Sequence, residues 1–166
     1  MSPGISPPTR TRMWESMLDA HCNHLYWGAL VRRYGNFDKY SRIFLAATSA
    51  SAVAAWAVLV DADALWKALS ALSALVAIAL PIINLQTAIE KATSLTVKWF
   101  RQMRDYEGLW AQGQSPDQED SQILPLLDQV SSREVDWKRE EIGLPDDQKL
   151  LSKCHDRVLE ARGLKG

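Results

Sequence analysis

Residues 43–60 read IFLAATSASAVAAWAVLV, and this uncharged stretch constrains the fold more than any other feature of the chain. At about 1.5 Å per residue it would form a helix about 27 Å long, close to the ~30 Å hydrocarbon core of a bilayer. A helix on the surface of a soluble bundle would instead show a polar face about every 3.6 residues. The stretch therefore favours a transmembrane helix over the alternative, a hairpin buried in a soluble bundle.

A second apolar stretch, residues 64–85, follows after Asp61, Ala62 and Asp63 alone. Its one charged residue, Lys67, lies near the outer end, where a long side chain can reach the lipid headgroups. Two spans joined by so short a connection form an antiparallel hairpin. The sequence thus predicts an all-α integral membrane protein with a transmembrane hairpin over residues 43–85, built from spans 43–60 and 64–85.

Basic residues flank the hairpin on both sides, whereas its loop carries two aspartates. Short segments rich in Lys and Arg stay in the cytoplasm. Both termini are therefore expected in the cytoplasm, and the protein is expected to be a multi-pass membrane protein. The basic residues are Arg32, Arg33, Lys39 and Arg42 before the hairpin, and Lys91, Lys98, Arg101 and Arg104 after it.

The segments outside the hairpin are expected to be mostly helical. Residues 1–12 are rich in Pro and Ser and predict a disordered tail. In residues 13–42 apolar side chains recur at steps of three and four, which predicts a cytoplasmic helix with one buried side, interrupted at Gly35, Asn36 and Asp38. Residues 113–120 read as a linker, and residues 121–166 predict amphipathic C-terminal helices, the last of them stopped by Gly163.

The second span is predicted to continue into the cytoplasm, because residues 86–112 hold no helix breaker before Gly108. Pro81 is the position at which such a rod would kink. One face of the rod forms a coiled-coil seam, which implies a partner helix, while Gln102 is expected on the exposed face. The seam consists of Leu85, Ile89, Ala92, Thr96, Trp99, Met103, Tyr106 and Trp110.

Stripes of small or polar residues mark both spans. Small residues let helices approach closely, and a polar stripe in a spanning helix indicates a function. Two interpretations stay open: the stripes pack the spans together within one protomer, or several protomers assemble and the second stripe borders a water-filled path. The first stripe is Ala46, Ala50, Ala54 and Ala57; the second is Lys67, Ser70, Ala74, Ala77, Pro81 and Asn84, opposite a lipid face of Leu65, Leu69, Leu72, Val76, Ala79 and Ile83.

No residue pattern predicts an enzyme, a cofactor or a nucleic-acid partner. The chain has no glycine-rich phosphate loop, no GxSxG and no HExxH, and its net charge of -1 gives no attraction to a phosphate backbone. His21, Cys22 and His24 are zinc-ligand types, but Cys22 lies on another helix face than the two histidines, and Cys154 and His155 are distant in sequence. We therefore expect no metal site, and no disulfide in a reducing cytoplasm.

This layout resembles the SLATT family, the "SMODS and SLOG-associating 2TM effector" domains of prokaryotic conflict systems. The resemblance is one of architecture over most of the chain: an N-terminal helix, basic residues before the first span, the tight loop at residues 61–63 and a long second helix. It implies a non-enzymatic effector that oligomerises and permeabilises the cell inner membrane under the control of a nucleotide-signalling protein partner. Two alternatives remain: a membrane-anchored adaptor that binds a soluble partner through the seam and the C-terminal helices, and a holin-like pore.

Overall fold

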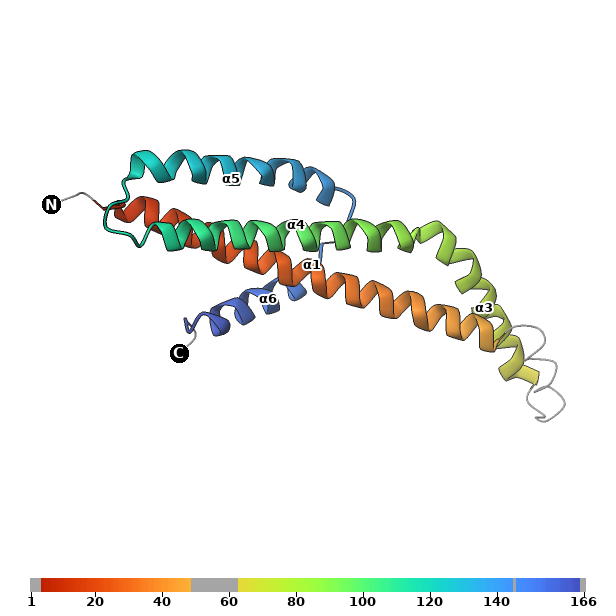
Figure 1. Ribbon diagram of the computed structural model, residues 1–166. Helices are drawn as coiled ribbons and strands as arrows, with labels where there is room; N and C mark the ends of the chain where they lie inside the picture. Colours follow the sequence, from red (N-terminus) through yellow and green to blue (C-terminus); the bar gives the residue numbers. More distant parts are fainter. Residues whose placement is uncertain (1–3, 49–62, 145, 165–166) are drawn as a thin grey trace. The chain divides into compact units, whose positions relative to one another are not determined.

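The computed structural model describes residues 4–48, 63–144 and 146–164, and within these ranges every regular element is a helix (Figure 1). The predicted all-α class is confirmed. The helices are α1 (Pro7–Ala47), α3 (Asp63–Ile83), α4 (Leu85–Gln112), α5 (Asp120–Glu141) and α6 (Gln148–Ala161). The chain divides into two units, which are described separately: unit 1 is Met1–Leu30 with Lys91–Gly166, and unit 2 is Val31–Glu90.

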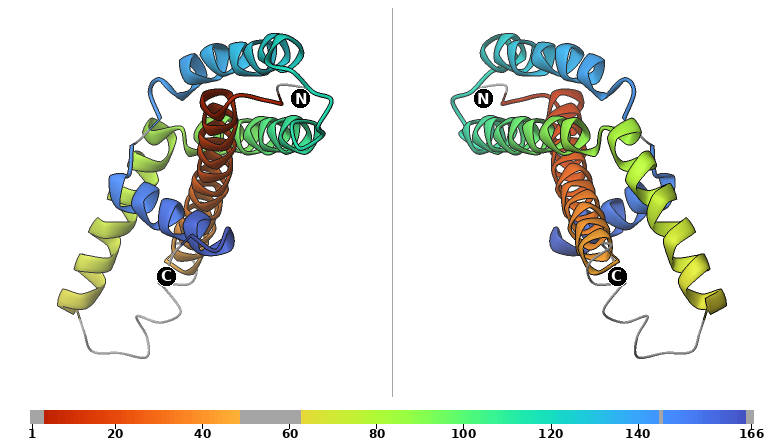
Figure 2. Two further views of the ribbon diagram at one scale, coloured as in Figure 1. Left: turned by 90° about the vertical axis from the view of Figure 1, so that its left-hand side faces the viewer. Right: turned by 90° about the vertical axis from the view of Figure 1, so that its right-hand side faces the viewer.

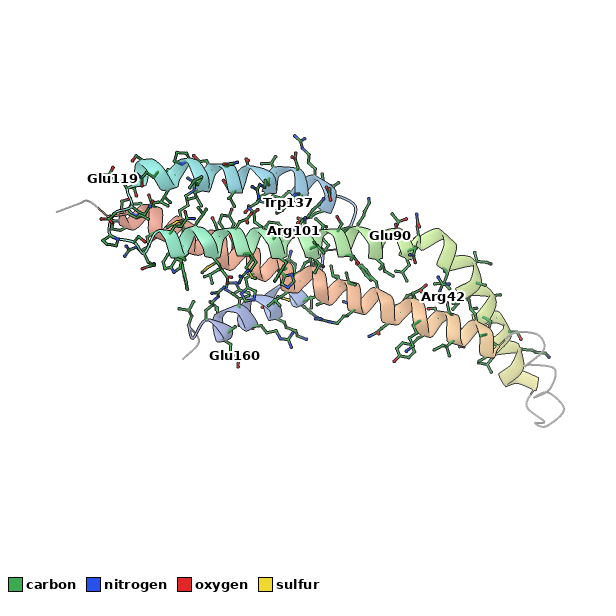
Figure 3. The ribbon with its side chains drawn as sticks, viewed as in Figure 1. Arg42, Glu90, Arg101, Glu119, Trp137 and Glu160 are labelled. Atoms are coloured by element: carbon green, nitrogen blue, oxygen red, sulfur yellow. The ribbon has the colours of Figure 1, made fainter. Side chains whose placement is uncertain are left out.

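Unit 1 is a group of four helical segments around an apolar core. The first part of α1 contacts α4 through two ring pairs, Trp14 with Trp110 at 5.2 Å and His24 with Phe100 at 5.1 Å between centroids. On α5, Trp137 lies towards α4 (Figure 3) and meets Trp99 edge to face at 5.6 Å. The core is filled by the buried side chains of Met13, Met17, Leu30, Leu95, Trp99, Tyr106, Ile123, Leu127 and Val158.

Both ends of α6 are fixed to other parts of unit 1. At its start, the Asp147 side chain caps the helix by accepting from the Leu150 backbone N–H at 3.0 Å. The Asp147 backbone N–H donates to the Tyr26 hydroxyl of α1 at 3.0 Å. At its end, Arg162 pairs with Glu107 of α4 at 2.7 Å, and Gly163 follows with a φ of 68°, as a helix-stopping glycine should.

The N-terminus differs from the predicted disordered tail. Helix α1 begins at Pro7 rather than near residue 13, and Ile5 and Thr9 are buried. The backbone N–H of Ser6 donates to the Asp120 carboxylate at 2.9 Å. Proline-rich composition suggested disorder, but proline suits the first turn of a helix, whose N–H groups have no intrahelical partner.

Helix α1 also continues through residues 35–38, where an interruption was predicted; it is one unbroken helix from Pro7 to Ala47 (Figure 2). Gly, Asn and Asp lower helix propensity by up to about 1 kcal/mol each without breaking the backbone ladder. In unit 2, Asp38 is bound by Arg42 one turn later at 2.8 Å, which supports the helix at this point.

The predicted rod with a kink at Pro81 is instead two helices, and the break between them lies at Asn84. Helices α3 and α4 are separated at Asn84, which has a φ of 45°. Pro81 has no backbone N–H to continue the helical ladder, and the break follows three residues later. Asn84 tolerates the left-handed conformation and starts α4: its Oδ1 accepts from the Thr87 hydroxyl at 2.9 Å, and its carbonyl accepts from the Ala88 N–H at 3.3 Å.

Among the described helices, none is by itself both long and apolar enough to cross a bilayer. The segments Lys67–Leu80 and Leu85–Gln112 reach that length and hydropathy only when they are taken together as a pair, across a bend of 52°. Most of the predicted first span, residues 49–60, and the loop at 61–62 lie outside the described residues.

Candidate functional site

The predicted polar stripe is exposed at every position whose side chain is described, that is, at all of its members except Pro81. Ser70, Ala74 and Ala77 are exposed, as are Lys67 and Asn84. The predicted lipid face is described at four of its positions: Leu69, Val76 and Ala79 are half-buried and Leu72 is exposed, while the side chains of Leu65 and Ile83 lie outside the described ones. Two further apolar residues of α3, Leu75 and Ile78, are also exposed, Leu75 to 65%. Helix α3 therefore presents both its stripe of small residues and a row of large apolar residues outward.

The predicted stripe of the first span is described at one position only. Ala46 is exposed near the end of α1, and Ala50, Ala54 and Ala57 lie outside the described residues. The end of α1 and the α3–α4 junction line a common pocket of about 380 Å³. Asp38, Arg42 and Leu45 line this pocket from α1, so the end of α1 lies beside the α3–α4 junction within unit 2.

The predicted seam on α4 is largely buried within the chain itself. Leu85 and Ile89 belong to unit 2, and the remaining seam residues pack in unit 1. Its buried members are Leu85, Ala92, Trp99, Met103 and Tyr106, and its half-buried members are Ile89, Thr96 and Trp110. The partner helices in unit 1 are α1 and α5 of the same chain, as the ring contacts of Trp110 and Trp99 show.

Sequence reasoning missed part of the buried surface of α4. Leu95, Gln102 and Leu109 are buried too, and Gln102, which was expected on the exposed face, is 0% exposed. A seam assumes one partner helix, but this helix is covered by both α1 and α5. The signal that pointed to the second partner was the apolar stripe of residues 121–141, whose Ile123 and Leu127 are fully buried.

Gln102 is part of a polar network inside unit 1. Its Nε2 donates to the Val130 carbonyl at 2.8 Å and lies 3.1 Å from the Tyr106 hydroxyl. That hydroxyl donates to Glu134 of α5 at 2.6 Å. Burial raises the pKa of Tyr106, and the adjacent Glu134 carboxylate raises it further. The network therefore keeps Tyr106 protonated and fixes the register of α4 against α5.

The carboxylate of Glu141, the last residue of α5, lies beside the indole groups of Trp99 and Trp27. Glu141 Oε1 accepts from Trp99 Nε1 at 3.2 Å, and Trp27 Nε1 lies near the carboxylate without a hydrogen bond of its own. Burial raises the pKa of Glu141, and the two indole groups partly offset this effect. Tyr26 and Trp27 line a pocket of about 260 Å³ beside Glu141.

We expect the pH dependence of stability to report this carboxyl group. The pKa of Glu141 is higher in the folded state than in the unfolded state, so the folded protein favours the protonated carboxyl group. Its contribution to folding stability is therefore fully present below the ordinary glutamate pKa. It is lost as pH rises through the pKa of the folded state. Asp19, whose pKa burial also raises, acts in the same direction. Glu141→Gln keeps an oxygen acceptor for Trp99 and should flatten the fall in urea-unfolding free energy between pH 4.5, the ordinary glutamate value, and neutrality. Glu160→Gln, on the exposed side of α6, is the control, and a wild-type slope in Glu141→Gln would contradict the assignment.

The histidines and cysteines do not form the zinc-type set considered above. Cys22 and Cys154 are buried, and neither forms a disulfide. Burial raises the pKa of the Cys22 thiol to about 11, with Cys154 as the second cause. His24 Nδ1 lies 3.1 Å from the Thr96 carbonyl, and burial lowers the pKa of His21. Among the described residues no three His, Cys, Asp or Glu side chains are placed to share a metal ion.

Comparison with protein-family models, with curated proteins and with solved structures found no match to this chain.

Proposed function

We propose that this chain is a non-enzymatic membrane effector whose unit 2 inserts into the cell inner membrane, assembles with other copies and makes the membrane permeable. The observation that carries the proposal is the exposed apolar surface of α3 in unit 2. Unit 1 has a core of side chains such as Trp99, Leu95 and Leu127 that are at most 2% exposed, and it also leaves single apolar side chains such as Val135 and Ile142 exposed. Unit 2 leaves Leu75 and Ile78 more than half exposed on a helix of which the described part carries few charges. Contiguous apolar surface of this kind fits lipid or another copy.

Assembly is supported by the small residues on α3. Ser70, Ala74 and Ala77 are exposed at successive turns, and small residues let helices of neighbouring copies approach closely within a bilayer. A ring of such copies would line its centre with the Ser70 hydroxyl and the Lys67 ammonium group, which can hold water. In this arrangement the apolar residues Leu72 and Leu75 face lipid.

Unit 1 is then the cytoplasmic part that controls assembly. The resemblance to SLATT proteins supports a role in prokaryotic defence, with a nucleotide-signalling protein as the partner that acts on this unit. The adaptor alternative is less well supported, because the seam it would use for a soluble partner is occupied by α1 and α5 of the same chain. The holin-like alternative is also less well supported, because a holin needs no folded unit such as the one that α4, α5 and α6 form after the second predicted span.

Dye release from vesicles tests the proposal. The full chain is reconstituted into vesicles of phosphatidylcholine and phosphatidylglycerol that hold a self-quenched dye, and membrane insertion is checked by flotation after an alkaline wash. We expect release that rises more steeply than linearly with the protein-to-lipid ratio, because several copies are needed for one path. Protein that floats with the vesicles but retains the dye would favour the adaptor. Protein that the alkaline wash removes would overturn the membrane assignment.

A further inference from the structure

One face of α1 in unit 2 combines basic and aromatic side chains. We refer to this set as the basic–aromatic face; it consists of Arg32, Arg33, Phe37, Lys39, Tyr40 and Ile43. At about 100° per residue, these six side chains fall within an arc of about 160°. All six are exposed, Tyr40 to 65%, whereas Tyr34, Asp38 and Leu45 on the other side of the helix are half-buried.

The charge of this face is not balanced by acids on the same segment. Asp38 is the sole acidic residue between positions 31 and 47, and it is bound to Arg42 at 2.8 Å. Arg32 and Lys39 thus give the face a net positive charge. Tyrosine, with an apolar ring and a polar hydroxyl, settles where hydrocarbon meets the headgroups, and a basic residue near an anionic leaflet is attracted to it.

We infer that the basic–aromatic face lies in the headgroup layer and selects anionic phospholipids, with Phe37, Tyr40 and Ile43 at the hydrocarbon boundary and Arg32 and Lys39 on the phosphate groups. This inference rests on the proposed membrane insertion of unit 2 and adds the class of lipid that the protein recognises. The face ends at Ile43, the first of the apolar residues 43–60, so it would reach the headgroups of the leaflet from which the hairpin inserts.

The test measures lipid selectivity in vesicles that contain the inserted full-length protein. Spin-labelled phosphatidylglycerol and spin-labelled phosphatidylcholine are compared by the fraction of each that is immobilised at the protein. Each basic residue near an anionic surface favours the charged lipid by about five-fold. We expect wild type to prefer phosphatidylglycerol, and the Arg32→Gln/Lys39→Gln variant to lose most of that preference, by about twenty-five-fold for two independent charges. Added salt should weaken the wild-type preference in the same direction.

A control removes the same kind of charge elsewhere. Lys149→Gln on the exposed side of α6 should keep the wild-type selectivity. Equal immobilisation of both lipids by wild type, or an equal loss in the Lys149 control, would overturn the inference. Because dye release is recorded on the same vesicles, release without lipid selectivity would leave the proposed function standing, whereas failure to insert would remove it. The salt dependence of wild type decides the matter even where the double variant inserts poorly.

Discussion

The Trp99→Asp variant is expected to lose the folded structure of unit 1 at room temperature. Trp99 is 2% exposed, and its indole donates to Glu141 and packs edge to face on Trp137. Truncating a buried aromatic costs about 3–5 kcal/mol, and an unpaired buried carboxylate next to Glu141 adds several more. Since small domains are stable by only about 5–15 kcal/mol, the sum is enough to unfold many of them.

Urea unfolding followed by circular dichroism measures this effect. The control is Val97→Asp, which adds the same charge to the same helix at a side chain that is 45% exposed. Surface changes of this type alter stability by about 0.5 kcal/mol or less. If both variants unfold at the same urea concentration, the packing of α4 between α1 and α5 would be wrong.

Gln102 shows where sequence reasoning about α4 reached its limit. Spacing of three and four residues correctly marked Trp99 and Tyr106 as buried, because it records one face of a helix. It placed Gln102 on the solvent side, since a polar residue outside an apolar stripe is usually exposed. The acceptor that makes its burial tolerable is the Val130 carbonyl, 28 residues away on α5, and no local pattern encodes a contact between helices at that distance.

The ends of elements were harder to predict than their type. The sequence predicted a kink at Pro81, but α3 continues through Pro81 to Ile83 and the break lies three residues later. The sequence pattern did not locate the break at Asn84, since that depends on which nearby residue accepts a positive φ and gives α4 its first turn. Likewise, Ile5 and Thr9 were assigned to a disordered tail. Their order depends on a contact between the Ser6 backbone and Asp120, which is far away in sequence.

The two faces of α3 could not be assigned from sequence for a different reason. Within a bilayer, small polar residues serve equally to pack helices and to border water, and one chain shows both Ser70 and Leu72 as exposed. Which face meets lipid depends on the neighbouring copies. A substitution that separates packing from conduction is therefore more informative than further inspection of the pattern.

The Ser70→Leu variant supplies that separation and is expected to lose ion conduction while it remains inserted. Removing the hydroxyl group and filling the space with an apolar side chain dries a narrow path, and dry constrictions block ions. A barrier raised by only about 1.4 kcal/mol already lowers a rate ten-fold, so we expect leakage to fall at least about ten-fold. Asn84 is not a suitable test position, because leucine at a φ of 45° would be strained and would alter the α3–α4 junction.

Membrane level and leakage have to be measured on the same preparation. Leu72→Ile keeps an apolar side chain of the same size at an exposed position of α3 and is the matched control; it should insert and conduct like wild type. If the stripe only packs helices, Ser70→Leu should lower the amount of inserted protein, because a larger side chain prevents close contact. Leakage would then fall only in proportion to protein. A Ser70→Leu protein that is inserted at the wild-type level and conducts like wild type would exclude this face as the lining of the path.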